Sequence, residues 1–85
     1  MVSTKPAAAQ HGVSFEGAQT VFLDDYALRF YDPDHSQDED RFIMLGISFK
    51  LRILIVCHCY KESDSVIRLI STRKATRQEA KHYGR

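Results

Sequence analysis

The sequence predicts a single α+β domain built on a small antiparallel sheet, and three observations support this. Runs rich in β-branched and aromatic residues follow one another at 41–49, 52–60 and 66–72. Only short polar or turn-like segments separate them, which favours antiparallel pairing of neighbours. Helical patterns stand before and after these runs. We therefore expect three to four strands, one helix packed on a face of the sheet and a helix at the C-terminal end.

The N-terminal part of the chain predicts two helical pieces. Pro6 favours a short helical turn through residue 9, which Gly12 would close. Ser14 is a favourable N-cap residue for a helix over residues 15–22. Apolar side chains recur there with the i, i+3, i+7 spacing of an amphipathic helix, so one face should pack on the sheet.

The remaining elements are marked by turn and capping signals. Residues 27–31 predict a short strand that ends at the Asp32-Pro33 turn, and a polar loop follows over 34–40. Thr76 and Glu79 have the spacing of a capping box, in which a threonine and a glutamate cap one helix start reciprocally. A final helix should begin there and reach Tyr83. Thr76 and Glu79 are thus the expected structural caps of this helix, and Ser14 is that of the first.

The five-residue turn before the last strand predicts a register for the final hairpin. If Tyr60 pairs with Val66, then His58 lies opposite Arg68, on the less covered face of the sheet. A cationic cluster is the expected result. Its further members would be Arg73 and Arg77.

The net charge of +1 hides a strong asymmetry between the two halves of the chain. Residues 1–40 hold two Lys or Arg against eight Asp or Glu, a net of −6, whereas residues 41–85 hold ten against three, a net of +7. This division predicts a basic surface for a polyanion. No apolar run approaches the ~20 residues of a membrane helix, so we expect a cytoplasmic protein that does not bind membranes.

The two cysteines, Cys57 and Cys59, are interpreted as small apolar core residues. A zinc site would need further ligands at a recognisable spacing, and the sequence has none. We therefore expect neither a metal nor another cofactor.

Three segments in order resemble the BrnT family of type II toxins. The first runs from His11-Gly12-Val13-Ser14-Phe15-Glu16 to Val21-Phe22 and Asp24; the second contains Asp32-Pro33-Asp34-His35-Ser36, Asp40-Arg41-Phe42-Ile43 and Gly46; the third contains Ile67-Arg68-Leu69-Ile70-Ser71, Arg73-Lys74-Ala75-Thr76, Glu79 and Tyr83, preceded by a strand with Val56 and His58. The resemblance places one toxin domain at 11–85. Residues 1–10 lack the strand that usually begins such chains, so they are expected to be an altered or disordered segment.

The resemblance implies a RelE-like fold and an endoribonuclease that inhibits translation. It also implies a cognate antitoxin, similar to BrnA, with a ribbon-helix-helix DNA-binding region. The toxin would then contact operator DNA only through the antitoxin. A catalytically inactive module that binds nucleic acid or the antitoxin is the alternative function.

Metal-independent RNA cleavage needs cations for the phosphate and a group that carries protons. Arg68 and Arg73 are the candidates for stabilising the phosphate, since guanidinium groups donate charge-assisted hydrogen bonds to its oxygens. His58 or Tyr83 is the candidate proton carrier. RNA-binding roles are expected for Arg77, Lys74, Arg41 and His11.

These residues also have purely structural interpretations. Arg68 could be a solvated cross-strand partner, and His58 a half-buried core histidine with satisfied hydrogen bonds. Glu79 fits a helix cap better than a catalytic base.

Overall fold

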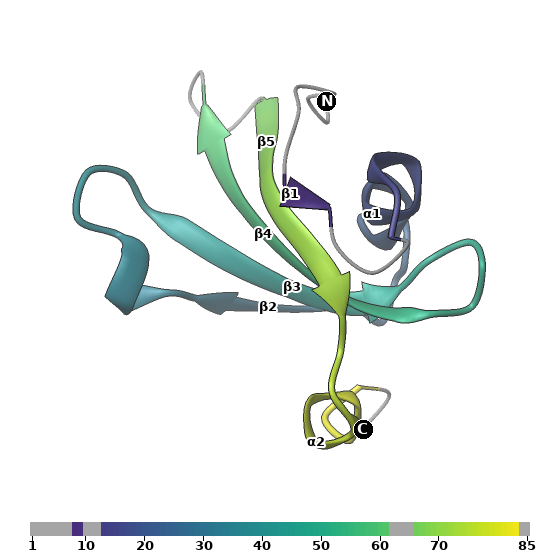
Figure 1. Ribbon diagram of the computed structural model, residues 1–85. Helices are drawn as coiled ribbons and strands as arrows, with labels where there is room; N and C mark the ends of the chain where they lie inside the picture. The colour runs from purple at the N-terminus through teal and green to yellow at the C-terminus, as the bar shows by residue number, and fades with distance from the viewer. Residues whose placement is uncertain (1–7, 10–12, 62–65, 84–85) are drawn as a thin grey trace.

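The computed structural model describes residues 8–9, 13–61 and 66–83 as a five-stranded sheet with two α-helices (Figure 1). The strands lie in the order β1-β5-β4-β3-β2. In chain order the elements are β1 (Ala8–Ala9), α1 (Phe15–Val21), β2 (Leu28–Tyr31), the 3-10 helix η1 (Pro33–His35), β3 (Arg41–Ile47), β4 (Ile53–Lys61), β5 (Val66–Lys74) and α2 (Arg77–Ala80).

The predicted α+β fold with an antiparallel sheet is confirmed. Strands β2, β3, β4 and β5 pair antiparallel in sequence order, and each lies within about two residues of its predicted range. The N-terminal prediction is wrong at Ala8–Ala9, which pair parallel with Ser71 and Thr72 of β5 instead of forming a helical turn. A short strand therefore precedes α1 after all.

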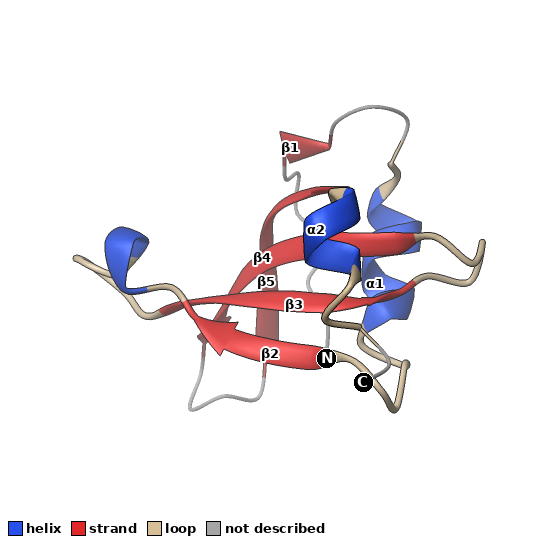
Figure 2. Cartoon of the chain, turned by 90° about the horizontal axis from the view of Figure 1, so that it is seen from below, coloured by secondary structure: helices blue, strands red, loops and turns tan. Residues whose placement is uncertain are grey.

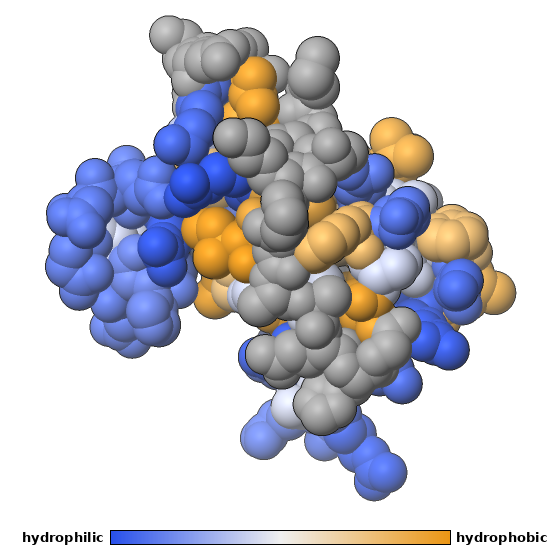
Figure 3. Space-filling view, turned by 45° about the horizontal axis from the view of Figure 1, so that its top comes forward, coloured by the Kyte–Doolittle hydropathy of each residue, from blue (hydrophilic) through white to orange (hydrophobic). Residues whose placement is uncertain are grey.

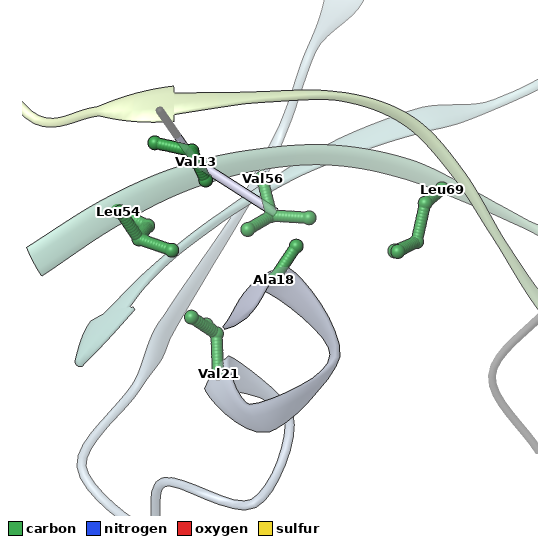
Figure 4. Close-up of a cluster of buried hydrophobic side chains, with 6 residues drawn as sticks. All are labelled: Val13, Ala18, Val21, Leu54, Val56 and Leu69. Atoms are coloured by element: carbon green, nitrogen blue, oxygen red, sulfur yellow. The ribbon is translucent and has the colours of Figure 1, made fainter. Parts of the chain in front are cut away.

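Helix α1 begins at its predicted cap and packs on one face of the sheet. The Ser14 side chain accepts a hydrogen bond from the backbone N–H of Gly17 at 3.0 Å. The helix buries Ala18 and Val21 completely. Figure 4 shows these two side chains pointing at the sheet, where they join the core residues Val13, Leu54, Val56 and Leu69.

The β4–β5 register differs from the predicted one already at the turn, where Lys61 instead of Tyr60 pairs with Val66, and a β-bulge interrupts the ladder further along. Cys57 pairs with Ser71 but His58 pairs with Leu69, so Ile70 is the extra residue on β5. The pairing at the turn places Arg68 opposite Cys59 instead of His58, and the bulge shifts only the pairs beyond Ile70. A one-residue shift moves a side chain to the other face of a strand, so the predicted pairing of His58 with Arg68 is wrong.

The two faces of the sheet are covered differently. Alternation along the strands places Val56 and His58 on the face that α1 covers, which we call the α1 face. Cys59 and its neighbours Arg41 and Arg68 lie on the opposite face, as does Arg73, which pairs with Ile55. Helix α2 lies on this second side, as Figures 1 and 2 show from two directions.

Helix α2 has the predicted capping box but is shorter than predicted. Thr76 accepts a hydrogen bond from the Glu79 N–H, and the Glu79 carboxylate accepts one from the Thr76 N–H. The helix ends at Ala80, so Tyr83 lies in the turn that follows. No helix in the described part of the chain is long and apolar enough to cross a membrane.

Candidate functional site

The loop between β2 and β3 holds a histidine beside an aspartate. His35 Nδ1 lies 2.9 Å from Asp32 Oδ2, and the His35 side chain is 67% exposed. Ser36 shapes the loop, because its hydroxyl donates to the Asp32 carbonyl and accepts from the Arg41 N–H. With Nδ1 engaged, Nε2 is the ring nitrogen that remains for a ligand.

A carboxylate and cations from three strands meet next to this loop. Arg41, Cys59 and Arg68 stand in one row across β3, β4 and β5, so the two arginines are about 10 Å apart at their backbones. Glu39, just before β3, accepts a hydrogen bond from Arg68 Nη2 at 2.5 Å. Lys61 Nζ lies 4.0 Å from the other Glu39 oxygen.

A small polar hollow lies beside these groups. We define the loop site by His35, Glu39 and Arg41, which line the hollow, together with Arg68, which donates a hydrogen bond to Glu39. A cavity of about 90 Å³ is lined by His35, Gln37, Asp38, Glu39 and Arg41. Arg41 is half-buried, and its Nε has no hydrogen-bond partner among the described residues. In Figure 3 hydrophilic residues gather over this loop, at the left of the view. The loop site thus combines proton-transferring groups with donors for an anion.

Arg73 lies far from the loop site and has a partner of its own. Its Nη1 and Nη2 donate to the two Glu79 carboxylate oxygens, both at 2.8 Å. These hydrogen bonds, more than the opposing burial, lower the pKa of Glu79 to about 2. Arg73 comes five positions after Arg68 along β5, a distance of about 15 Å. The neighbouring cations Lys74 and Arg77 are exposed.

His58 is part of the core of the α1 face. Its side chain is completely buried, 4.9 Å from the Phe22 ring in an edge-on contact. Burial is the main reason why the pKa of His58 is lowered from its usual value. The predicted cluster of His58 with Arg68 and Arg73 is therefore wrong, because His58 lies on the α1 face, the two arginines lie on the opposite face, and these arginines are far from each other.

Tyr83 is tied to the loop after α1. Its hydroxyl donates to Asp24 Oδ2 at 2.5 Å, and this hydrogen bond raises the pKa of Tyr83 to about 12. Asp24 Oδ2 also accepts from the Ile47 N–H. The pair fastens the C-terminal turn to the sheet. The remaining predicted RNA-binding residue, His11, lies outside the described residues.

The family of the chain follows from a comparison with family models. A model described as the ribonuclease toxin BrnT of type II toxin-antitoxin systems matches residues 4–79. The chain belongs to the BrnT family. Ribonuclease activity and a cognate antitoxin follow from this membership. No curated protein matches the chain.

For this BrnT family member, sequence reasoning missed three residues of the loop and its surroundings. Asp32 was interpreted as a turn residue, and His35 and Glu39 as parts of a polar loop, and none of the three was given a role in the site. The i, i+3 spacing of Asp32 and His35 on either side of the turn-forming Pro33 was the available signal. Nothing local indicated that Glu39 would meet Arg68. Among the described residues, no three potential metal ligands come together.

Proposed function

We propose that this BrnT family chain is a metal-independent endoribonuclease that inhibits translation and cleaves RNA at the loop site. The proposal rests on one observation. Glu39 accepts a hydrogen bond from Arg68 and lines a cavity together with Arg41 and the exposed His35. Cleavage by the 2′-hydroxyl of RNA needs a proton acceptor, cations for the phosphate and a proton donor. The loop site has a side chain for each of these tasks.

The proposed reaction assigns one step to each group. Glu39 takes the proton of the 2′-hydroxyl as its oxygen forms a bond to phosphorus. Arg41 and Arg68 neutralise the charge that builds on the phosphate oxygens. His35, held by Asp32 through Nδ1, gives a proton from Nε2 to the leaving 5′-oxygen as its bond to phosphorus breaks. The products are a 2′,3′-cyclic phosphate and a 5′-hydroxyl.

The other predicted residues keep supporting roles in this proposal. Lys74 and Arg77, exposed at the far end of β5 and the start of α2, bind the RNA backbone away from the scissile phosphate. Arg73 orders this region through Glu79. His58 and Tyr83 have no role in the reaction. His58 is buried, and a Tyr83 hydroxyl with a pKa of about 12 is a poor proton donor near neutral pH.

The proposed partner is a BrnA-like antitoxin with a ribbon-helix-helix region, through which the complex binds operator DNA. An acidic or amphipathic segment of the antitoxin covers Arg41 and Arg68 and so blocks the loop site. Association should weaken as salt rises, because screening reduces the attraction of exposed charges. Co-expression with the adjacent gene's product and pull-down tests this. A chain that stays unbound would contradict it.

The activity is tested by cleavage of a labelled RNA with the purified chain, with and without a chelator. We expect equal rates in both conditions and products that end in a 2′,3′-cyclic phosphate. A chelator that abolishes cleavage would refute the metal-independent mechanism. RNA binding without any cleavage would support the inactive binding module instead.

A further inference from the structure

A second and larger cavity lies on the α1 face of the sheet. It measures about 560 Å³ and is lined by Arg29, Asp40, Phe42 and Tyr60. Phe42 and Asp40 are neighbours of Arg41 and Glu39, so this cavity is at the same end of the sheet as the loop site. The cavity opens on the α1 face whereas the loop site lies on the opposite face, because side chains alternate along β3. No step of the proposed RNA cleavage uses this cavity.

Arg29 is held in this cavity by aromatic rings. Its guanidinium carbon lies 5.0 Å from the centre of the Phe42 ring and 5.6 Å from that of Tyr60. Nη1 donates to the Tyr60 hydroxyl at 3.0 Å. Within the described part of the chain Arg29 forms no ion pair, in contrast to Arg68 and Arg73. Its other N–H groups are therefore donors in a fixed position.

Tyr60, which lines the cavity beside Arg29, is held in place by a hydrogen bond with the buried His58. His58 Nδ1 lies 3.3 Å from the Val56 carbonyl, and Nε2 lies 3.3 Å from the Tyr60 hydroxyl. A carbonyl only accepts, so Nδ1 carries the hydrogen and Nε2 of the neutral ring accepts from Tyr60. The lowered pKa of His58, caused mainly by burial, agrees with a neutral ring. The Tyr60 oxygen is thereby aimed at Arg29.

Asp40 supplies acceptors in the same cavity. Its Oδ1 accepts a hydrogen bond from the Tyr31 hydroxyl at 3.1 Å. In the described residues Oδ2 has no hydrogen-bond partner, and Asp40 is exposed to solvent. A cavity that offers a carboxylate acceptor, guanidinium donors and the aromatic rings of Phe42 and Tyr60 suits a flat ligand with donors on one edge and acceptors on another.

We propose that this cavity binds a guanine base of single-stranded RNA, and so gives the enzyme its base preference. Guanine has N–H donors on its Watson–Crick edge for Asp40, and the O6 and N7 acceptors that arginine recognises. The exposed ring of Tyr31, which contacts Phe42 at the side of the cavity, offers a stacking surface, as in other single-strand sites. Adenine, cytosine and uracil lack this combination. This inference rests on the proposed function, because that function supplies RNA as the ligand.

Binding of the four nucleoside 5′-monophosphates to the purified chain, measured by calorimetry, tests this independently of cleavage. We expect guanosine monophosphate to bind about tenfold or more tightly than the other three. Asp40→Asn should remove this preference, and Arg29→Lys should weaken it while keeping the positive charge. Asp25→Asn, which removes another exposed carboxylate that lies outside the cavity, should leave the preference unchanged.

Equal binding of all four nucleotides, competition by inorganic phosphate alone or a preference that survives Asp40→Asn would overturn the proposal. Far-UV circular dichroism controls for folding of each variant. Because monophosphates have no phosphodiester to cleave, guanine binding by a chain that leaves RNA intact would contradict the proposed function alone. RNA cleavage without a guanine preference would contradict only the base pocket.

Discussion

Arg68 donates a hydrogen bond to Glu39, which stands 29 positions earlier in the chain. The contact joins the loop before β3 to the first half of β5, so two distant segments complete one site. It also holds the guanidinium group at the loop before β3 in a defined direction. A phosphate that enters the loop site can take over donors of Arg68 and free Glu39 to accept a proton.

The first prediction concerns the charge on Arg68. Arg68→Ala should lower the rate of RNA cleavage about 10²–10³-fold, because a donor to the transition-state phosphate is lost. The half-buried position of the side chain predicts that the fold is kept. Single-turnover cleavage rates of variant and wild type provide the measurement. Arg52→Ala, an exposed arginine in the β3–β4 turn, is the matched control. Equal losses in both variants would indicate a general charge effect.

The second prediction concerns His35 and the residue that orients it. His35→Gln should slow cleavage about 10²–10⁴-fold, the usual range for loss of a proton-transferring group. Asp32→Asn should cause a smaller loss, since the ring remains but its orientation is less fixed. The comparison variant is His82→Gln, which alters an exposed histidine beyond α2. Full activity of His35→Gln would exclude His35 as the proton donor.

The third prediction concerns close packing at Gly46. A Cβ there would lie 2.8 Å from Val21 Cγ1 and 2.9 Å from Ala27 Cβ, well inside van der Waals contact. Gly46→Ala should therefore lower the free energy of unfolding by about 1–3 kcal/mol. Urea unfolding measures this. Gly17→Ala, whose Cβ would meet only Ser14 Oγ at 3.3 Å, should cost much less because alanine also favours the helix. Similar stabilities of both variants would contradict the packing argument.

The fold was predictable because its signals are local. Ser14 and the pair Thr76 and Glu79 mark helix starts through contacts within three or four residues, and the strands stand out by composition. The bulge at Ile70 has no such signal, since one extra residue changes neither composition nor turn type. The exact register at the turn has no such signal either: Lys61 instead of Tyr60 pairs with Val66, and this one-residue shift places His58 and Arg68 on opposite faces. The Glu39–Arg68 contact depends on the assembled sheet, so only the tertiary structure reveals it.

The last prediction concerns the ion pair of Glu79 with Arg73. The hydrogen bonds from Arg73 help to lower the pKa of Glu79 to about 2, from an ordinary 4.5. As pH falls below 4.5 the unfolded chain therefore takes up the proton before the folded one does. The ionised carboxylate stabilises the folded state above pH 4.5, and this contribution fades as the pH approaches 2. The side chain is 35% exposed, so solvent screening limits the contribution to about 1 kcal/mol.

Glu79→Gln isolates the charge, because glutamine at this position can still serve the capping box. The variant should melt about 4–8 °C below wild type at pH 7, the shift that ~1 kcal/mol causes in a domain of this size. The difference should shrink between pH 4.5 and pH 2, where the wild-type carboxylate becomes protonated. Thermal unfolding followed by circular dichroism at pH 7, 4.5 and 2.5 measures it. A difference that stays constant over this range would show that Glu79 acts through its cap alone and that its ion pair with Arg73 adds nothing.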